Sequence, residues 1–146
     1  MDNTKNAPPL AVTQAVTLEL IDASGVGTPI EAELQYDSKD PYAVTTVFIT
    51  GTSRVRWTFG RELLSVGLYE PTGDGDVHVW PCLDTEGRAV VIVELCSPDG
   101  EALIQARTGD LTSFMDRIDK AVPIGTEHNH VNVDAAITAI LAAETS

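Results

Sequence analysis

Positive charge is scarce in this chain of 146 residues. Nine Lys and Arg stand against 22 Asp and Glu, which gives a formal net charge of −13. Proteins that bind DNA or RNA neutralise many phosphates with Lys and Arg, so this balance argues against a nucleic acid as a main partner. It disfavours an anionic membrane surface for the same reason. The acidity favours solubility and attraction to basic patches on other proteins.

Long apolar runs are also missing. No run approaches the roughly 18 residues that a membrane-spanning helix needs. The first ten residues, MDNTKNAPPL, lack the apolar core of a secretory signal, so a cytoplasmic protein is expected. The hydrophobic share of 43% is that of a folded chain, and the length suits one domain with its own core. We predict a flexible N-terminus over residues 1–10 and a single α+β domain over residues 11–146.

Cysteine is limited to Cys82 and Cys96. If residues 77–84 and 88–96 pair through a turn at 85–87, Cys82 lies opposite Ala89 to Val91 and Cys96 lies near Asp76. The two thiols then do not meet, and a reducing cytosol would keep them reduced in any case. We therefore predict two free thiols rather than a disulfide.

The motifs of familiar enzymes are absent. The glycine-containing stretch PTGDGD (71–76) lacks the lysine and the serine or threonine of a phosphate-binding loop, and its aspartates would repel phosphate, so it is interpreted as a turn. No G-x-S-x-G elbow and no C-x-x-C pair occurs. We predict no catalytic residue, no cofactor and no enzymatic activity.

One group of residues could bind a metal ion. His78, Trp80 and Cys82 alternate along a predicted strand and so project from one face. Together with His128 and His130 they could form a composite zinc site, although the two later histidines lie in a polar connector. The alternative is that Trp80 packs in the core or in an interface, with His78 satisfied beside it or exposed. We favour this packing and expect a largely buried Trp80.

Hydrophobic periodicity predicts strands before helices. Apolar and polar residues alternate or cluster in β-prone runs separated by Gly, Pro and Asp. The expected strands cover residues 12–21, 30–36, 42–51, 54–59, 77–84, 88–96 and 101–108. The continuous apolar run in RAVVIVELC (88–96) indicates a strand buried on both faces, inside the sheet or at a subunit interface.

Helical periodicity appears in three places. Residues 60–68 suit one or two helical turns. Leu111, Phe114, Met115, Ile118 and Val122 form an apolar stripe that starts after Asp110 or Thr112 and stops at Pro123. A last helix is expected from about Asp134 to Ala143. Strands grouped before helices predict an α+β domain with mainly antiparallel pairing, of about seven strands and two C-terminal helices.

The one basic strip is a candidate binding surface. Arg54, Arg56 and Arg61 lie around Trp57, with both arginines of RVRWTF (54–59) on one face and Val55, Trp57 and Phe59 on the other. Such a strip could stack and bind single-stranded nucleic acid. In so acidic a chain, contact with a protein partner is favoured.

Several segments together resemble one family in order and spacing. These segments are DPYAVTTVF (40–48), RWTFGRELLSVGL (56–68), PTGDGDVHVWP (71–81), SPDGEALIQA (97–106) and FMDRIDKAVPIGTEH (114–128). The family is that of the SsgA-like proteins, regulators of sporulation-specific cell division in actinomycetes, and the likeness covers about residues 11 to 143. Within it, the chain looks most like the SsgB type.

The resemblance implies a non-enzymatic role. Such proteins recruit the tubulin-like division GTPase FtsZ and promote its assembly at sporulation septa, together with other SsgA-like and membrane-bound division proteins. By similarity, two packed antiparallel sheets followed by helices are expected, as in the Whirly single-stranded-DNA-binding proteins, in a homotrimer. A Whirly-like nucleic-acid-binding protein is the alternative function, although a shared fold does not establish a shared function.

Overall fold

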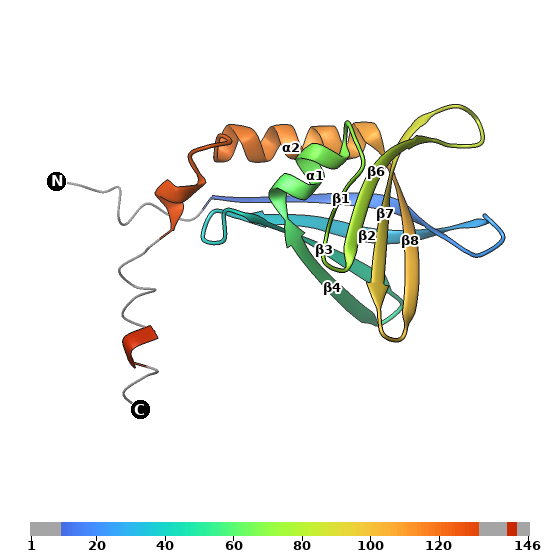
Figure 1. The fold of residues 1–146 in the computed structure, drawn as a ribbon, viewed down its shortest axis with the longest axis horizontal. Coiled ribbons are helices and arrows are strands. Elements are labelled where there is room, and N and C mark those ends of the chain that lie inside the picture. Colours follow the sequence, from blue (N-terminus) through green and yellow to red (C-terminus); the bar gives the residue numbers. More distant parts are fainter. Residues whose placement is uncertain (1–9, 132–139, 143–146) are drawn as a thin grey trace.

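The computed structural model describes residues 10–131 and 140–142. Strands come first and a long helix follows them, with one short helix between the fourth and fifth strands (Figure 1). The elements are β1 (Ala11–Ile21), β2 (Gly27–Asp37), β3 (Ala43–Thr50), β4 (Ser53–Gly60), α1 (Arg61–Gly67), β5 (Thr72–Asp74), β6 (Val77–Leu83), β7 (Ala89–Ser97), β8 (Gly100–Arg107), α2 (Thr108–Ala121) and the 3-10 turn η2 (Glu127–His130).

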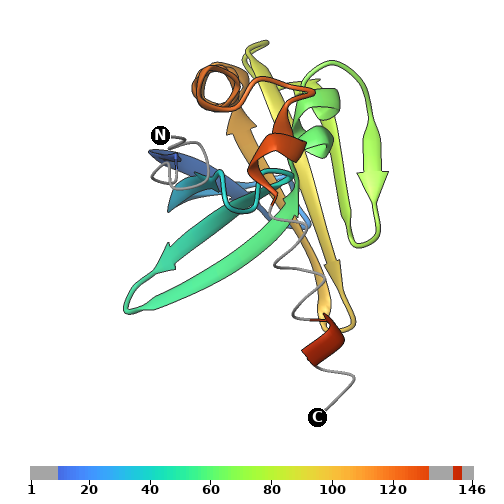
Figure 2. The same cartoon turned by 90° about the vertical axis from the view of Figure 1, so that its left-hand side faces the viewer.

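The strands form one antiparallel sheet rather than the two packed sheets expected from the sequence. Its order is β4-β3-β2-β1-β8-β7-β6-β5, so two four-stranded meanders are joined where β1 meets β8. That junction comprises only three residue pairs, from Glu19↔Gln105 to Ile21↔Leu103. Beyond it the two halves diverge, and the sheet curls until its inner faces oppose each other (Figure 2). The α+β class and the antiparallel pairing are confirmed, whereas the Whirly likeness stays a prediction.

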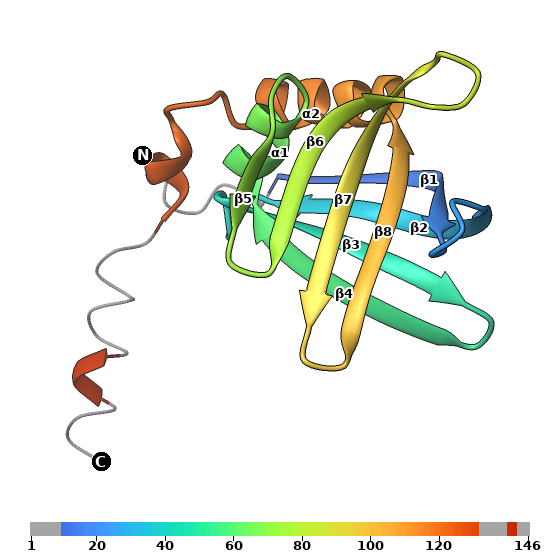
Figure 3. The same ribbon diagram turned by 45° about the vertical axis from the view of Figure 1, so that its right-hand side comes forward.

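The curl encloses the core. Figure 3 shows β5 to β8 crossing β1 to β4, with both helices along one end of the curled sheet. The inner face takes every second residue of each strand, which accounts for the alternation seen in the sequence. The fully buried large side chains include Phe114, Leu64, Ile118, Val44, Val79, Val91 and Val122. β7 lies between β6 and β8, so the predicted position inside the sheet is confirmed. Burial on both faces is not, because Ile92, Glu94 and Cys96 on the outer face are only half-buried.

Helix α2 closes this core with the predicted stripe. Leu111, Phe114, Met115, Ile118 and Val122 are all buried. The predicted N-cap was wrong: the helix begins at Thr108, its N-cap residue is Arg107, and no side chain caps it. It starts directly at the end of β8, since the chain passes from strand to helix without a connecting loop. At the other end Val122 leaves helical geometry and its N–H donates to the Ile118 carbonyl.

The stretch PTGDGDVHVWP folds as a hairpin. Thr72–Asp74 forms the short strand β5, which was not predicted, and it pairs with the start of β6. Gly75 at the turn has φ of 59°, a left-handed conformation that glycine adopts without steric cost. The interpretation as turn residues is therefore confirmed for Gly75 and Asp76, whereas Gly73 and Asp74 belong to β5.

Two expectations concern the chain ends. The flexible N-terminus predicted over residues 1–10 lies outside the described residues, apart from Leu10, whose N–H donates to the Ser38 hydroxyl. Most of the helix predicted over 134–143 also lies outside them, although residues 140–142 are helical. The polar connector before it contains η2, which sequence periodicity did not indicate. The single domain over 11–146 stays a prediction.

Candidate functional site

Arg54, Arg56 and Trp57 lie on β4, the edge strand of the sheet. Strand alternation puts both arginines on the outer face, where they are exposed, and turns Trp57 to the inner face, where it packs against the core. Arg56 donates to the Gln35 side chain at 3.3 Å. The predicted division of RVRWTF between two faces is confirmed. The predicted grouping of Trp57 with the arginines at one surface is not.

Arg61 lies apart from this strip, inside the protein. Its side chain is 3% exposed, and its Nη2 donates to the Val122 carbonyl at 2.7 Å. Nη1 lies 3.4 Å from the Tyr36 hydroxyl and 3.9 Å from the Glu127 carboxylate. Burial raises the pKa of Tyr36, and the charge of Arg61 opposes that rise. Arg61 thus joins the start of α1 to the end of α2.

These positions bear on the two binding hypotheses. A single-strand binder needs cations beside an accessible stacking surface. Here the exposed arginines of β4 and the ring of Trp57 are on opposite faces, and Arg61 is buried. The structure thus does not assemble the nucleic-acid platform considered from the sequence. Protein binding through Arg54 and Arg56 stays a prediction.

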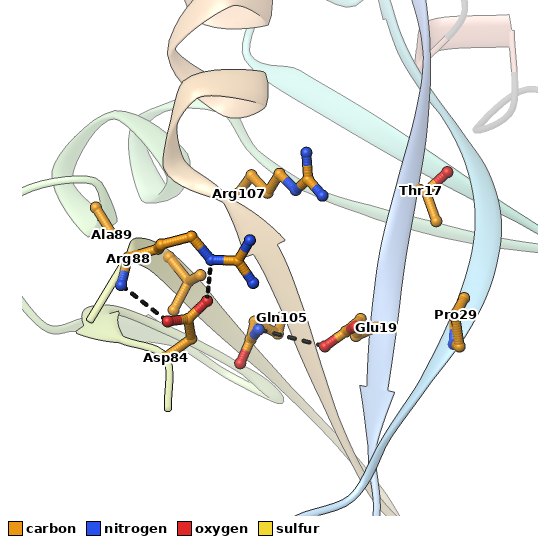
Figure 4. Close-up of a pocket in the computed structure, with 9 residues that line it drawn as sticks. Thr17, Glu19, Pro29, Asp84, Arg88, Ala89, Gln105 and Arg107 are labelled. Carbon is orange, nitrogen blue, oxygen red and sulfur yellow. Dashed lines mark hydrogen bonds and ion pairs between the residues drawn. The ribbon is translucent and has the colours of Figure 1, made fainter. Parts of the chain in front are cut away.

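A polar pocket of about 340 Å³ lies on the outer face where β1 and β8 diverge. Figure 4 shows side chains reaching it from β1, β2, β8 and the β6–β7 turn. It is lined by Thr17, Glu19, Pro29, Asp84, Arg88, Ala89, Val90, Gln105 and Arg107. No local pattern in the sequence indicates this pocket, because its lining comes from positions up to about 90 residues apart.

Charge in the pocket is balanced. Arg88 lies 2.8 Å from the Asp84 carboxylate and 2.9 Å from that of Glu86. The Arg88 backbone N–H and guanidinium both donate to Asp84 and hold the pKa of its carboxyl below the ordinary value. Arg107 has no ion-pair partner among the described residues. Two carboxylates and two guanidiniums line the pocket, so it suits a ligand carrying both signs better than a simple anion.

His78, Trp80 and Cys82 do share one face of β6, as predicted, but that face is the outer one. Val77 and Val79 take the inner positions and are buried. Trp80 is therefore half-buried against the outer surface instead of filling the core, which corrects the expectation of a largely buried ring. Val77 and Val79 occupy the inward-facing positions of β6, so Trp80, one position further along the strand, faces outward.

The composite zinc site considered from the sequence is not formed. Cys82 lies at the far end of β6, with its thiol 3.4 Å from the Leu83 carbonyl. Among the described residues, the one group of three or more metal-ligating side chains is His78, Glu94 and Cys96, whose ligand atoms all lie within 4.8 Å of one another.

The register of β6 and β7 produces this group. His78 pairs directly with Glu94, and its Nδ1 is 3.3 Å from Oε1 of that residue. Cys82 pairs with Val90, and the Cys96 N–H donates to the Asp76 carbonyl, so both predicted cysteine positions are confirmed and the thiols are free. The predicted hairpin register already implied the His78–Glu94 pair. The ligands predicted from the sequence were histidines and cysteines alone, so the Glu94 carboxylate was missed.

Desolvation raises the pKa of the Cys96 thiol, and the carboxylates of Glu94, Glu101 and Asp76 raise it further. A thiol in this field is a poor nucleophile by itself, because the thiolate is the reactive form. The group offers ligands rather than an activated nucleophile.

None of the helices in the described part of the chain is long and apolar enough to span a bilayer.

Comparison with known proteins gives a consistent result. The family described as Streptomyces sporulation and cell division protein, SsgA, matches residues 30–127. The sporulation-specific cell division protein SsgB of Streptomyces coelicolor is 48% identical over 126 residues, covering 86% of this chain and 91% of that protein. The SsgB protein of Kineococcus radiotolerans is 43% identical, covering 86% and 77% of the two chains.

Two solved structures share the fold. One comes from a study of SsgB mutations and longitudinal cell division in Streptomyces coelicolor; it has a TM-score of 0.79 at 46% identity and covers 84% of this chain and 96% of that one. The other is an SsgA-like sporulation-specific cell division protein of Thermobifida fusca, with a TM-score of 0.82 at 36% identity and coverage of 91% and 97%. The sheet and α2 therefore belong to an established fold.

Proposed function

Because the chain belongs to the SsgA family of sporulation and cell division proteins, we propose that it is a non-enzymatic regulator that recruits FtsZ and promotes FtsZ assembly at sporulation septa. The observation that carries this proposal is the likeness, over most of both chains, to proteins named sporulation-specific cell division protein SsgB. The agreement in fold with two solved relatives supports it.

We propose further that the protein acts in the cytoplasm as a homotrimer and reaches the membrane only through other division proteins. A trimer would present each partner-binding surface three times. Repeated weak contacts with a polymer then gain affinity through effective concentration, without any new contact. This arrangement suits an assembly factor, whose partner is itself a repeating filament. The Whirly-like architecture belongs to the same set of expectations from the family resemblance.

The partner surface that we propose is the outer side of β4. An edge strand offers unpaired backbone groups to another chain, a common way to bind a protein segment. Arg54 and Arg56 stand exposed on this strand, and among the described residues Arg54 has no ion-pair partner. Two cations on an otherwise acidic protein would favour an acidic patch on FtsZ or on another division protein.

Co-sedimentation with FtsZ polymers tests the proposal. Wild-type protein should increase the FtsZ pellet or the bundling of filaments, alone or with other SsgA-like proteins. The double variant Arg54→Glu/Arg56→Glu should lose most of this effect while keeping the unfolding transition of the wild type, because both side chains are exposed. High salt should also reduce the effect of the wild-type protein on FtsZ pelleting, because salt screens the attraction between exposed charges.

A matched control separates local contact from net charge. Lys39→Glu/Lys120→Glu changes two other exposed cations and shifts the net charge by the same amount. It should pellet with FtsZ as the wild type does. If both double variants lose the effect equally, the β4 surface is not the contact. If the wild type itself never alters FtsZ pelleting, with or without family partners, the proposed function is wrong.

A further inference from the structure

Three chemically different ligands meet on the outer face of β6 and β7. His78 and Glu94 are direct cross-strand partners, and Cys96 follows Glu94 by two positions and so projects from the same face. The imidazole, carboxylate and thiol atoms all lie within 4.8 Å of one another. Paired strands fix these positions through backbone hydrogen bonds, so the group is held by the sheet and not by a loop.

Gly73 orients the histidine. It pairs with His78 across the β5–β6 ladder, and the imidazole ring occupies the space into which a side chain at position 73 would extend. A methyl group at position 73 would collide with Cδ2 of that ring. The missing side chain therefore leaves the space that the ring occupies while its Nδ1 lies 3.3 Å from Oε1 of Glu94. This is a second reason for a glycine in PTGDGD, separate from the turn at Gly75.

The donor set matches zinc. Zn²⁺ takes thiolate, imidazole and carboxylate ligands at about 2.0 to 2.3 Å in tetrahedral geometry, which puts neighbouring ligand atoms about 3 to 4 Å apart. The ligand atoms already lie within 4.8 Å of one another, and direct and diagonal positions on paired strands, about 4.5 to 8 Å apart, are within reach of such side chains. Three protein ligands leave one position for water.

The surroundings carry the charge that a cation needs. Glu101 pairs with Cys96 from β8, and Asp76 adjoins the group at the start of β6. His78 is about half exposed, which leaves a path for an ion from solvent. The Cys96 thiol would lose its proton to water when the metal binds. The negative field that disfavours a bare thiolate is favourable to the metal-bound one.

We propose that His78, Glu94 and Cys96 form a binding site for one Zn²⁺ per chain, with Gly73 positioning the imidazole. The site lies on the outer surface of β6 and β7, at the opposite end of the sheet from β4, and its binding does not depend on the FtsZ proposal.

Titration of the full-length, reduced protein with Co²⁺ as a spectroscopic substitute tests it. Binding through Cys96 should produce a thiolate-to-cobalt charge-transfer band in the near ultraviolet at one Co²⁺ per chain, and Zn²⁺ should bleach it. Cys96→Ser should abolish the band. His78→Ala should weaken Zn²⁺ binding by at least about 100-fold, because loss of a ligand costs more than the 10- to 100-fold loss of an outer-shell change.

The second cysteine provides the control. Cys82→Ser removes a thiol from the same strand and the same face, but outside the group, and should leave the band and the affinity unchanged. Gly73→Ala should weaken binding by about 10- to 100-fold while the charge-transfer band survives at saturation. A band that persists in Cys96→Ser or disappears in Cys82→Ser would overturn the assignment, as would the absence of any thiolate band in the wild type.

Discussion

Replacing Arg61 tests whether this residue holds the fold together or binds a partner. Its guanidinium is buried at the junction of α1 with the end of α2, and its best contact is the 2.7 Å hydrogen bond to the Val122 carbonyl. That carbonyl follows the last turn of α2, where the backbone has left helical geometry. Arg61→Met keeps much of the side-chain volume but removes every donor. We therefore expect a clear loss of stability and no direct loss of a binding contact.

The magnitude can be worked from the contacts. A hydrogen bond from a charged group contributes about 1.5 to 3 kcal/mol, and an unsatisfied buried acceptor costs about 1 to 3 kcal/mol. The carboxylates at 3.8 and 3.9 Å add less, because Asp119 is 54% exposed and its charge is screened. The Nε of Arg61 lacks a partner in the described structure, so its removal relieves a desolvation cost. Together these give a loss of about 2 to 4 kcal/mol.

Urea unfolding at fixed protein concentration, followed by tryptophan fluorescence, measures this loss. Arg61→Lys should fall between wild type and Arg61→Met, since an ammonium can reach one acceptor but cannot serve Val122 and Tyr36 together. Arg54→Met, the same change at an exposed site, should stay within about 0.5 kcal/mol of wild type. If Arg61→Met unfolds like the wild type but no longer pellets with FtsZ, Arg61 is a binding residue and its structural role is refuted.

Two further changes test the packing and the electrostatics. Gly67→Ala should destabilise the protein despite the helix propensity of alanine, because the added methyl would collide with Val79 and overpacking costs about 1 to 3 kcal/mol; Val79→Ala in the same chain should restore part of the loss seen in thermal unfolding. Asp84→Asn tests the lowered pKa of Asp84. Because this pKa is lower in the folded than in the unfolded protein, the ionised carboxylate stabilises the fold at pH values above the unfolded pKa of about 3.9. That stabilisation is lost as the pH falls through the folded-state pKa. The melting temperatures of wild type and Asp84→Asn should therefore differ at neutral pH and converge under acid conditions.

The local fold could be predicted from the sequence because it follows from periodicity. Alternation located seven strands to within a few residues, and the spacing of three and four located α2. The hairpin of β6 and β7 was predicted in its correct register, which placed both cysteines. These features depend on neighbours in the sequence, where the pattern of apolar residues and turn residues carries the information.

Features that depend on distant partners could not be predicted. The single sheet results from three residue pairs between β1 and β8, which are separated by about 80 residues, and no local pattern marks such a junction. From the sequence, Arg61 is expected at the surface, because arginine is seldom buried. Its acceptor is the carbonyl of Val122, whose position is set only when α2 packs. On β6, alternation separated Val79 from Trp80 but did not say which of them faces inward.

The distribution of positive charge limits where an acidic partner could bind. Of the arginines in the described structure, Arg61 is buried, Arg88 is engaged by Asp84 and Glu86, and Arg117 donates to the Thr13 carbonyl and the Gln14 side chain. The remaining arginines are Arg54 and Arg56 on β4 and Arg107 in the outer pocket, where Asp84 and Glu19 balance the charge. Lys39 and Lys120 are exposed as single cations elsewhere, so a partner attracted by charge would meet two neighbouring cations at β4 and balanced charge at the pocket. Within the described part of the chain, β4 has a neighbouring strand on one side only, so backbone groups of its other edge are offered at the same place, and the electrostatic and hydrogen-bonding reasons favour the same strand.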